Sequence, residues 1–265
     1  MTELVHKEAT GKIIGVYYDV YNGTSRTYPE FVYENAMLRD LRRMGMTCER
    51  QEEYQICYKG WIVGRQRLDL FVANEVIVEL KVAEGITSLH KAQTRSYLKT
   101  FDKRVGLLFN FGSTVPEFDR IFFEPHPVEN PSPSESTAAK DLTDLIAPEI
   151  THEIIGALYT VHSTLGPGFV HRIYANACYR ELQERGVPVR PQKEMQVVYR
   201  GEPIASIKFS HLRVADVALV FPVAIRDINA IRFNNIKEWL RIQQVPLAIL
   251  ANFETLSLDP LILKA

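Results

Sequence analysis

Apolar residues recur at helical spacing near the start of the chain and again after residue 29. Four of them fit one face of a helix over about residues 8–22: Ile13, Ile14, Tyr17 and Val20. A second helix is predicted from about Pro29 to Met44, because proline suits the first helical position and Gly45 suits the end. The chain therefore opens with two consecutive helices.

Runs rich in β-branched and aromatic residues follow these helices and predict strands near residues 50–58, 61–72 and 75–82. Beyond them, the pattern predicts one more helix over about 87–100 and strands near 104–111 and 118–123. Helices, a three-stranded meander, a helix and a strand, in this order, are typical of an α/β sandwich with a mixed sheet.

The predicted hairpin "DLFVANEVIVELK" carries two carboxylates that should face each other. Asp69 and Glu79 lie five residues on either side of Asn74, the centre of the plausible turn. Residues opposed across an antiparallel pair have Cβ atoms roughly 4.5–5.5 Å apart, and like charges there are destabilising. Side chains alternate along a strand, so Lys81 shares the face of Glu79. The pattern thus brings two carboxylates and a lysine into one small volume.

Two interpretations of this hairpin remain open at the level of the residues. In one, the strand is exposed and Lys81 neutralises a carboxylate. In the other, the apolar neighbours of Glu79 bury it, and an unpaired buried charge is costly. A divalent cation held by Asp69, Glu79 and a backbone carbonyl would remove the repulsion, and two carboxylates suit Mg²⁺ or Mn²⁺. Lys81 would then orient a water or stabilise negative charge on a phosphate.

The chain also contains an internal repeat. "KIIGVYYDVYN" returns as "EIIGALYTVHS", "FVYENAMLRDLRRMGM" as "RIYANACYRELQERGV", and "YKG" at Tyr58 as "YRG" at Tyr199, always 141 residues later. "LLFNF", ending at Phe111, returns as "AILANF", ending at Phe253, one residue further on. We therefore predict two tandem domains, residues 1–124 and 148–265, joined by a Pro/Ser-rich linker over 125–147.

Composition narrows the class of protein. The chain has 265 residues, 46% of them hydrophobic, and a formal net charge of −1, which argues against nucleic-acid binding by bulk charge but allows a locally basic groove. No apolar run reaches the roughly 18–20 residues of a membrane helix, and the N-terminus lacks the apolar core of a signal peptide. Three widely spaced cysteines suggest neither a disulfide framework nor a zinc site, so we expect a cytoplasmic protein.

The hairpin residues and the repeated segments make the first repeat resemble the GxxExxY group of the PD-(D/E)XK nuclease superfamily. The second repeat resembles this group more weakly. The motifs are "IIG", the Glu-x-x-Tyr of Glu30 and Tyr33, the aspartate Asp69, "VELK", "AQTRSYL" and "LLFNFG". The resemblance implies two tandem nuclease-like α/β domains, each a mixed β-sheet flanked by helices. The turn before Glu30 departs from the pattern, because the expected "LGPGF" is "TSRTYPEF" here, with Thr27 in place of the glycine.

The resemblance also assigns roles to particular residues. By that likeness Asp69, Glu79 and Glu30 would bind the metal, Lys81 would position the nucleophilic water, and Gln93 would support the site from the following helix. Bland alternatives remain. Glu30 suits the first turn of a helix through the helix dipole alone. Gln93 would be part of an ordinary polar patch, and Tyr97 and Tyr33 would pack in the core. His90, Gln93 and Tyr97 lie on one helical face.

The second repeat lacks this constellation. Its Glu30 position is His171, and an offset of 141 puts Ser210, Val220 and Pro222 at the positions of Asp69, Glu79 and Lys81. Further on, Asn235 and Trp239 take the positions of Gln93 and Tyr97. The second repeat is therefore expected to be degenerate and inactive.

The leading hypothesis from the sequence is a Mg²⁺- or Mn²⁺-dependent nuclease that cleaves DNA or RNA with the first repeat, the second serving as scaffold. The two repeats would form an internal pseudo-dimer, with a monomeric chain as the expected state. The alternative is a non-catalytic nucleic-acid-binding or regulatory module. A third hypothesis is metal-dependent chemistry on another phosphate ester.

Overall fold

The structure is a computed structural model that describes residues 6–50, 53–124, 146–225, 227–228 and 231–265. Nearly all of the predicted linker, residues 125–145, lies outside the described residues. The chain divides into two compact units. The first comprises residues 1–56 and 65–129, and the second comprises residues 57–64 and 130–265.

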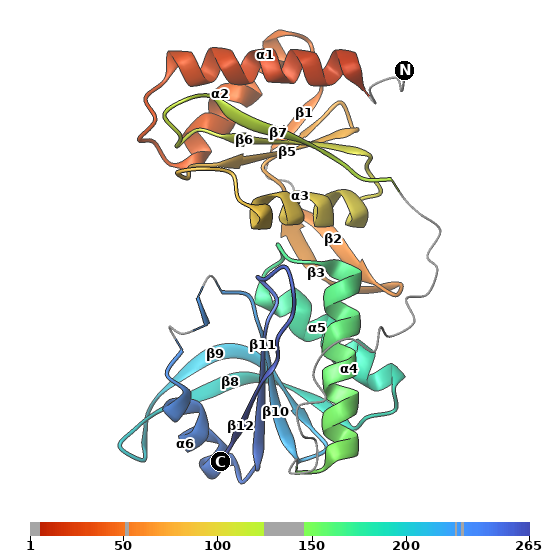
Figure 1. Cartoon of the computed structure of the whole chain (residues 1–265), viewed down its shortest axis with the longest axis vertical. Coiled ribbons are helices and arrows are strands. Elements are labelled where there is room, and N and C mark those ends of the chain that lie inside the picture. Colours follow the sequence, from red (N-terminus) through yellow and green to blue (C-terminus); the bar gives the residue numbers. More distant parts are fainter. Residues whose placement is uncertain (1–5, 51–52, 125–145, 226, 229–230) are drawn as a thin grey trace. The chain divides into compact units, whose positions relative to one another are not determined.

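The first unit is built on a five-stranded mixed sheet in the order β1-β4-β5-β6-β7, in which only β5 and β6 run parallel. Two helices pack on one face of the sheet and α3 covers the other (Figure 1). The elements are α1 (Lys7–Gly23), α2 (Glu30–Arg43), β1 (Cys48–Arg50), β4 (Leu70–Val72), β5 (Val76–Lys81), α3 (Ser88–Thr100), β6 (Val105–Asn110) and β7 (Glu117–Phe122). The predicted helices and strands of this region all form.

The predicted three-stranded meander forms in the first repeat, because β1 pairs with β4 and β4 with β5, all antiparallel, but its first two strands are interrupted. After Arg50 the chain leaves the main sheet, and β2 (Glu53–Tyr58) and β3 (Trp61–Arg67) pair in a separate two-stranded sheet. The physical reason is burial, because Tyr58 and Val63 are each only 1% exposed and belong to residues 57–64, which pack within the second unit.

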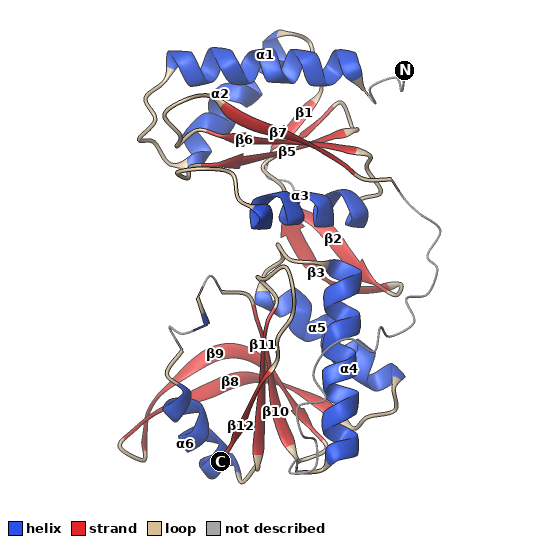
Figure 2. Cartoon of the chain, in the orientation of Figure 1, coloured by secondary structure: helices blue, strands red, loops and turns tan. Residues whose placement is uncertain are grey.

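The second unit repeats the same architecture with continuous long strands, so β8, β9 and β10 form an antiparallel meander. Its sheet has the order β12-β11-β10-β9-β8, and β10 runs parallel to β11. The elements are α4 (Pro148–Leu165), α5 (His171–Glu184), β8 (Val189–Tyr199), β9 (Glu202–Val214), β10 (Ala218–Val223), α6 (Phe233–Gln243), β11 (Leu247–Asn252) and β12 (Leu261–Lys264). Two mixed sheets flanked by helices confirm the predicted fold class (Figure 2).

A buried tyrosine plays the same packing role in both units. Tyr33 is fully buried, stacks on Phe111 with ring centroids 4.3 Å apart, and donates its hydroxyl hydrogen bond to the Ser25 carbonyl at 2.6 Å. Tyr174 stacks on Phe253 and donates to the Gly166 carbonyl in the same way. The tyrosine therefore fixes the turn before the second helix of each repeat to the core, which agrees with the packing interpretation.

In the described part of the chain, no helix is both long enough and apolar enough to span a membrane.

Candidate active site

The hairpin of β4 and β5 brings Asp69 and Glu79 opposite each other. Its register pairs Leu70 with Val78 and Val72 with Val76, so the turn is centred on Asn74, as predicted. Residues 73–75 form the turn: Ala73 and Asn74 both have positive φ, and the Glu75 N–H donates to the Val72 carbonyl at 3.1 Å. Continued by one position, this register pairs Asp69 with Glu79.

Strand β5 forms because its residues suit a sheet that is covered on both faces. Val76, Val78 and Leu80 are fully buried in the core cluster that includes α1 and α2. Since side chains alternate, Glu79 and Lys81 lie on the opposite face, the face that α3 covers. Glu79 is only 5% exposed. The exposed-strand interpretation of this glutamate is therefore wrong.

Two short contacts hold the acidic pair. The Lys81 ammonium donates to Glu79 Oε1 at 2.7 Å. Asp69 Oδ2 accepts a hydrogen bond from the backbone N–H of Leu80 at 2.8 Å. Each carboxylate thus has one strong partner, and the three side chains of the predicted constellation gather at one end of β5.

Burial disfavours the charged forms of the two carboxylates. Burial and then the neighbouring Glu79 raise the pKa of Asp69 well above its usual value. Burial also raises the pKa of Glu79, although Lys81 opposes this shift. Burial lowers the pKa of Lys81, but Glu79 and Asp69 outweigh it, so the net shift is upward and the lysine stays charged. One lysine leaves the two carboxylates incompletely compensated.

Helix α2 brings two more carboxylates to the same region. Glu30 begins the helix and accepts a hydrogen bond from the Val82 N–H at 3.3 Å, just beyond Lys81. Glu34, one helical turn later, is 4% exposed and accepts from Arg50 Nε at 3.0 Å. Glu34 contributes to the raised pKa of both Asp69 and Glu79.

Sequence reasoning missed Glu34. The available signal was its spacing of four residues from Glu30, which puts the two on one helical face. The structure adds that this face is partly buried, which the sequence pattern alone did not reveal.

Helix α3 carries the remaining predicted residues. Thr87 and His90 form a reciprocal capping box at its start, each side chain bonding the other residue's backbone N–H at 3.2 Å. His90 therefore has a structural role. Tyr97 is 4% exposed and packs in the core, while Gln93 is half-buried on the helix that covers β5. The supporting role of Gln93 stays a prediction.

The "NFG" motif after β6 anchors the segment that follows Lys81. Asn110 Oδ1 accepts from the N–H groups of Ala83 and Gly112 at 3.1 and 3.0 Å, and its Nδ2 donates to Glu117 at 2.9 Å. Gly112 passes so close to this segment that a Cβ there would lie 2.5 Å from the Ala83 nitrogen. The motif thus fixes the backbone at the end of β5.

The donor set fits a hard divalent cation. Asp69 and Glu79 supply carboxylate oxygens in a region where negative charge is in excess, and Mg²⁺ is commonly held by one or two carboxylates together with waters and substrate phosphates. Among the residues that the structure describes, no group of three His, Cys, Asp or Glu side chains is placed to hold an ion. Water or backbone oxygens would therefore complete the coordination.

The strand registers correct the alignment of the second repeat. The turn residues Ala215 and Asp216 match Ala73 and Asn74, so the offset is already 142 at this hairpin. The extra residue lies earlier in the chain, between Glu202 and Val214, where the pairing of β8 and β9 is irregular. The positions of Asp69, Glu79 and Lys81 are therefore occupied by His211, Phe221 and Val223, and the equivalences with Ser210, Val220 and Pro222 are wrong.

The corrected positions form an aromatic cluster. His211 is fully buried and stacks on Phe221 with ring centroids 5.1 Å apart, while His171 stacks on Phe209 at 5.3 Å. Burial lowers the pKa of both histidines. Neither strand position keeps a carboxylate, but one of them keeps an ionisable group.

The comparisons with known proteins agree with this duplication. A family model described as the PD-(D/E)XK nuclease superfamily matches the chain twice, over residues 7–121 and 148–262. The chain therefore belongs to the PD-(D/E)XK nuclease superfamily. No protein in the curated collection matches it.

Proposed function

We propose that the chain is a metal-dependent nuclease whose active site lies in the first repeat, at the end of β5. The observation that carries the proposal is the convergence of the buried Glu79, the half-buried Asp69 and a charged lysine, with Lys81 only 2.7 Å from Glu79. The superfamily is one of nucleases, which makes a nucleic-acid phosphodiester the expected substrate. The motifs around Glu30 and Tyr33 support membership of the GxxExxY group.

Each residue of the site would have a separate role in phosphodiester cleavage. Asp69 and Glu79 would hold Mg²⁺ or Mn²⁺, an ion that supplies a Lewis acid for the phosphate and an activated water, and Glu30 lies at the edge of the site. Lys81 stays charged beside Glu79, so it can orient the attacking water and offset negative charge that develops on the phosphate. Gln93 would support this arrangement from α3.

The second repeat would act as an inactive scaffold. His211 and Phe221 replace the two carboxylates, and an aromatic stack offers no pair of hard oxygen ligands. One chain would therefore hold one catalytic site.

Metal-binding calorimetry, with a nuclease assay on the same samples, tests this proposal. Mg²⁺ and Mn²⁺ are titrated into the wild type, Glu79→Gln and Glu84→Gln. Glu84 is exposed and lies five residues further on, so its variant makes the same change of charge outside the site. Each protein is then incubated with single- and double-stranded DNA and RNA.

We expect metal binding and cleavage in the wild type and in Glu84→Gln, and loss of both in Glu79→Gln. Equal behaviour of all three proteins, without bound metal, would mean that the acidic pair is structural. The non-catalytic binding module would then be the better account.

A further inference from the structure

We call residues 57–64 the first hairpin tip. This tip packs on helix α5 of the second unit. Within the second unit, Tyr58 and Lys59 both donate to Glu181 Oε2 of α5, Tyr58 at 2.7 Å. The Arg180 guanidinium lies 4.2 Å from the centre of the Trp61 ring. These side chains come from the turn and from one face of α5.

The backbone of the same tip is also held. Asn176 Nδ2 donates to the Val63 carbonyl at 2.7 Å. Gly64 lies against Ile173 so closely that a Cβ would be 2.6 Å from its side chain. The α5 face is therefore a built receptor for a hairpin tip, with polar, cationic and apolar contacts.

The duplication provides a second set of the same parts. Residues 198–205, the second hairpin tip, turn in the same way, because Arg200 and Gly201 have positive φ like Lys59 and Gly60. In this second tip Val198 is buried, but the counterparts of Tyr58 and Val63 are not: Tyr199 is 57% exposed and Ile204 is 63% exposed.

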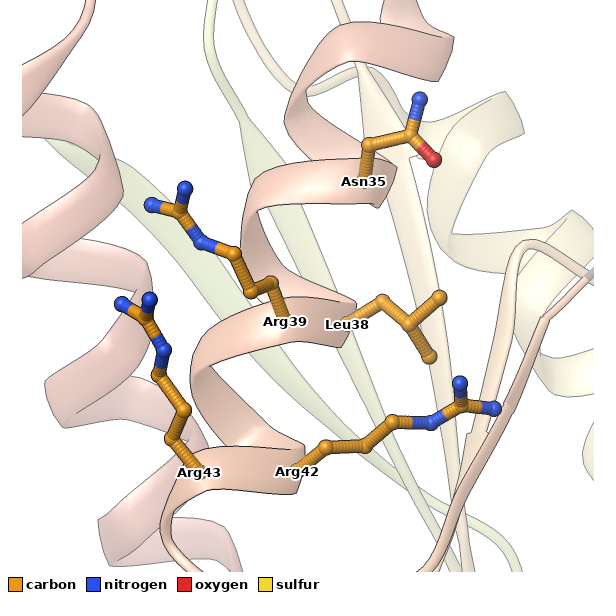
Figure 3. Close-up of a pocket in the computed structure, with 5 residues that line it drawn as sticks. All are labelled: Asn35, Leu38, Arg39, Arg42 and Arg43. Carbon is orange, nitrogen blue, oxygen red and sulfur yellow. The ribbon is translucent and has the colours of Figure 1, made fainter.

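The matching receptor face on α2 is open as well. At the offset of 141, the residues that receive the first tip on α5 correspond to Val32, Asn35, Arg39, Asp40 and Arg43. Three of the equivalent side chains, with Leu38 and Arg42, line a pocket of about 430 Å³ on α2 (Figure 3). Among the residues that the structure describes, the second tip and the α2 face are thus a tip and a receptor face that are not joined as residues 57–64 and α5 are.

The charges of these two parts fit each other. Glu202 stands at the position of Trp61, and Arg39 stands at the position of Arg180, so a cation–π contact would become an ion pair. Arg200 and Asp40 likewise replace Lys59 and Glu181 with the signs kept. Two contacts change for the worse. Ala205 stands at the position of Gly64, where a Cβ has no room against Ile173, and the smaller Val32 stands at the position of Ile173. In addition, Arg43 replaces Glu184 opposite the basic turn residue. Arg43 already lies 3.6 Å from Asp40, which partly offsets its charge.

We propose that a second molecule of this chain occupies the α2 face, inserting its residues 198–205 as residues 57–64 insert on α5. Each molecule offers one tip and one receptor, so reciprocal insertion between two copies would make the contact twice. The occupant is a second copy of the chain because the tip carries Glu202 and the exposed apolar side chains of Tyr199 and Ile204, which complement the basic face of α2.

Sedimentation velocity and light scattering of the full-length chain over a range of concentrations test the inference. The wild type should associate, and Arg39→Glu or Glu202→Arg should each weaken association at least about tenfold, the effect of losing one well-placed interface contact. The double variant Arg39→Glu/Glu202→Arg restores the opposite charges and should recover most of the affinity. Glu194→Arg, an exposed glutamate further along β8, is the matched control and should leave association unchanged.

Two results would overturn the inference. One is a monomer at all concentrations, the state expected for a self-contained pseudo-dimer. The other is a dimer that none of these charge reversals affects, since that dimer would use another surface. Neither readout involves nucleic acid or metal, so the outcome is independent of the proposed nuclease activity.

Discussion

At the scale of single residues, the first repeat keeps an arrangement that works against its own stability. Asp69 and Glu79 share one face of a hairpin, and burial raises the pKa of both. Apolar residues of similar size would pack there without a desolvation cost, as Phe221 does in the second repeat. Natural proteins commonly carry such destabilising groups where activity requires them. The contrast between the two repeats therefore supports a functional role for the pair.

His211, at the position of Asp69, should make the second unit sensitive to acid. Burial lowers its pKa, so the unfolded chain takes up a proton at a higher pH than the folded chain does. The neutral His211 therefore contributes its full stabilisation above the pKa of histidine in the unfolded chain, about 6.5. This stabilisation is lost as the pH falls below that value. His211→Phe should flatten this acid loss.

Denaturant unfolding at pH 7.5 and pH 5.5, followed by tryptophan fluorescence, measures this effect. Both tryptophans, Trp61 and Trp239, belong to the second unit and so report on it. His152→Gln, which alters an exposed histidine of the same unit, is the control. An unchanged pH dependence in His211→Phe would contradict the prediction.

At the scale of elements, hydrogen bonds to the loop after β5 fix the position of the site. Strand β5 ends at Lys81, and the next backbone groups are held by Glu30 from α2 and by Asn110 from the end of β6. The second unit keeps the same anchor, because Asn252 accepts from the Ile225 N–H at 3.2 Å. The anchor thus belongs to the fold, and only the side chains placed by it differ between the repeats.

Gly112→Ala should break this anchor in the first unit. The added Cβ would lie 2.5–2.6 Å from backbone atoms of Ala83, so the segment after Lys81 must move. We expect a loss of about 1–3 kcal/mol in stability, the usual cost of overpacking, together with loss of cleavage.

Gly11→Ala is the matched control for this prediction. Gly11 lies in α1 with open space around its Cβ position, so alanine should be neutral or stabilise by about 0.5–1 kcal/mol. Thermal unfolding by circular dichroism compares the two variants. Equal stability of both would show that the close approach at Gly112 is not constraining.

At the scale of the whole molecule, the sequence predicted the elements well and their pairing less well. Helical periodicity and end signals located α1, predicted over 8–22 and found at Lys7–Gly23, and α2, predicted from Pro29 to Met44 and found at Glu30–Arg43. The departure of β2 and β3 from the main sheet was not predictable, because it depends on contacts of residues 57–64 within the second unit.

The site residues of the second repeat were misplaced for a different physical reason. All six residues of β10 are buried, so its pattern does not distinguish the two faces of the sheet. Side chains alternate along a strand, and a slip of one residue therefore moves every assignment to the wrong face. Only the observed register located the inserted residue and revealed His211 and Phe221 at the equivalent positions.

The most direct test of the account is a cleavage assay on paired variants at the two equivalent positions. The wild type, Asp69→Asn and His211→Phe are compared at equal folded concentration, with labelled DNA and RNA in the presence of Mg²⁺. The account predicts that Asp69→Asn reduces cleavage by about a hundredfold or more, whereas His211→Phe stays within a few-fold of the wild type. Equal rates for the wild type and Asp69→Asn, or loss of cleavage in His211→Phe alone, would contradict a single active site in the first repeat.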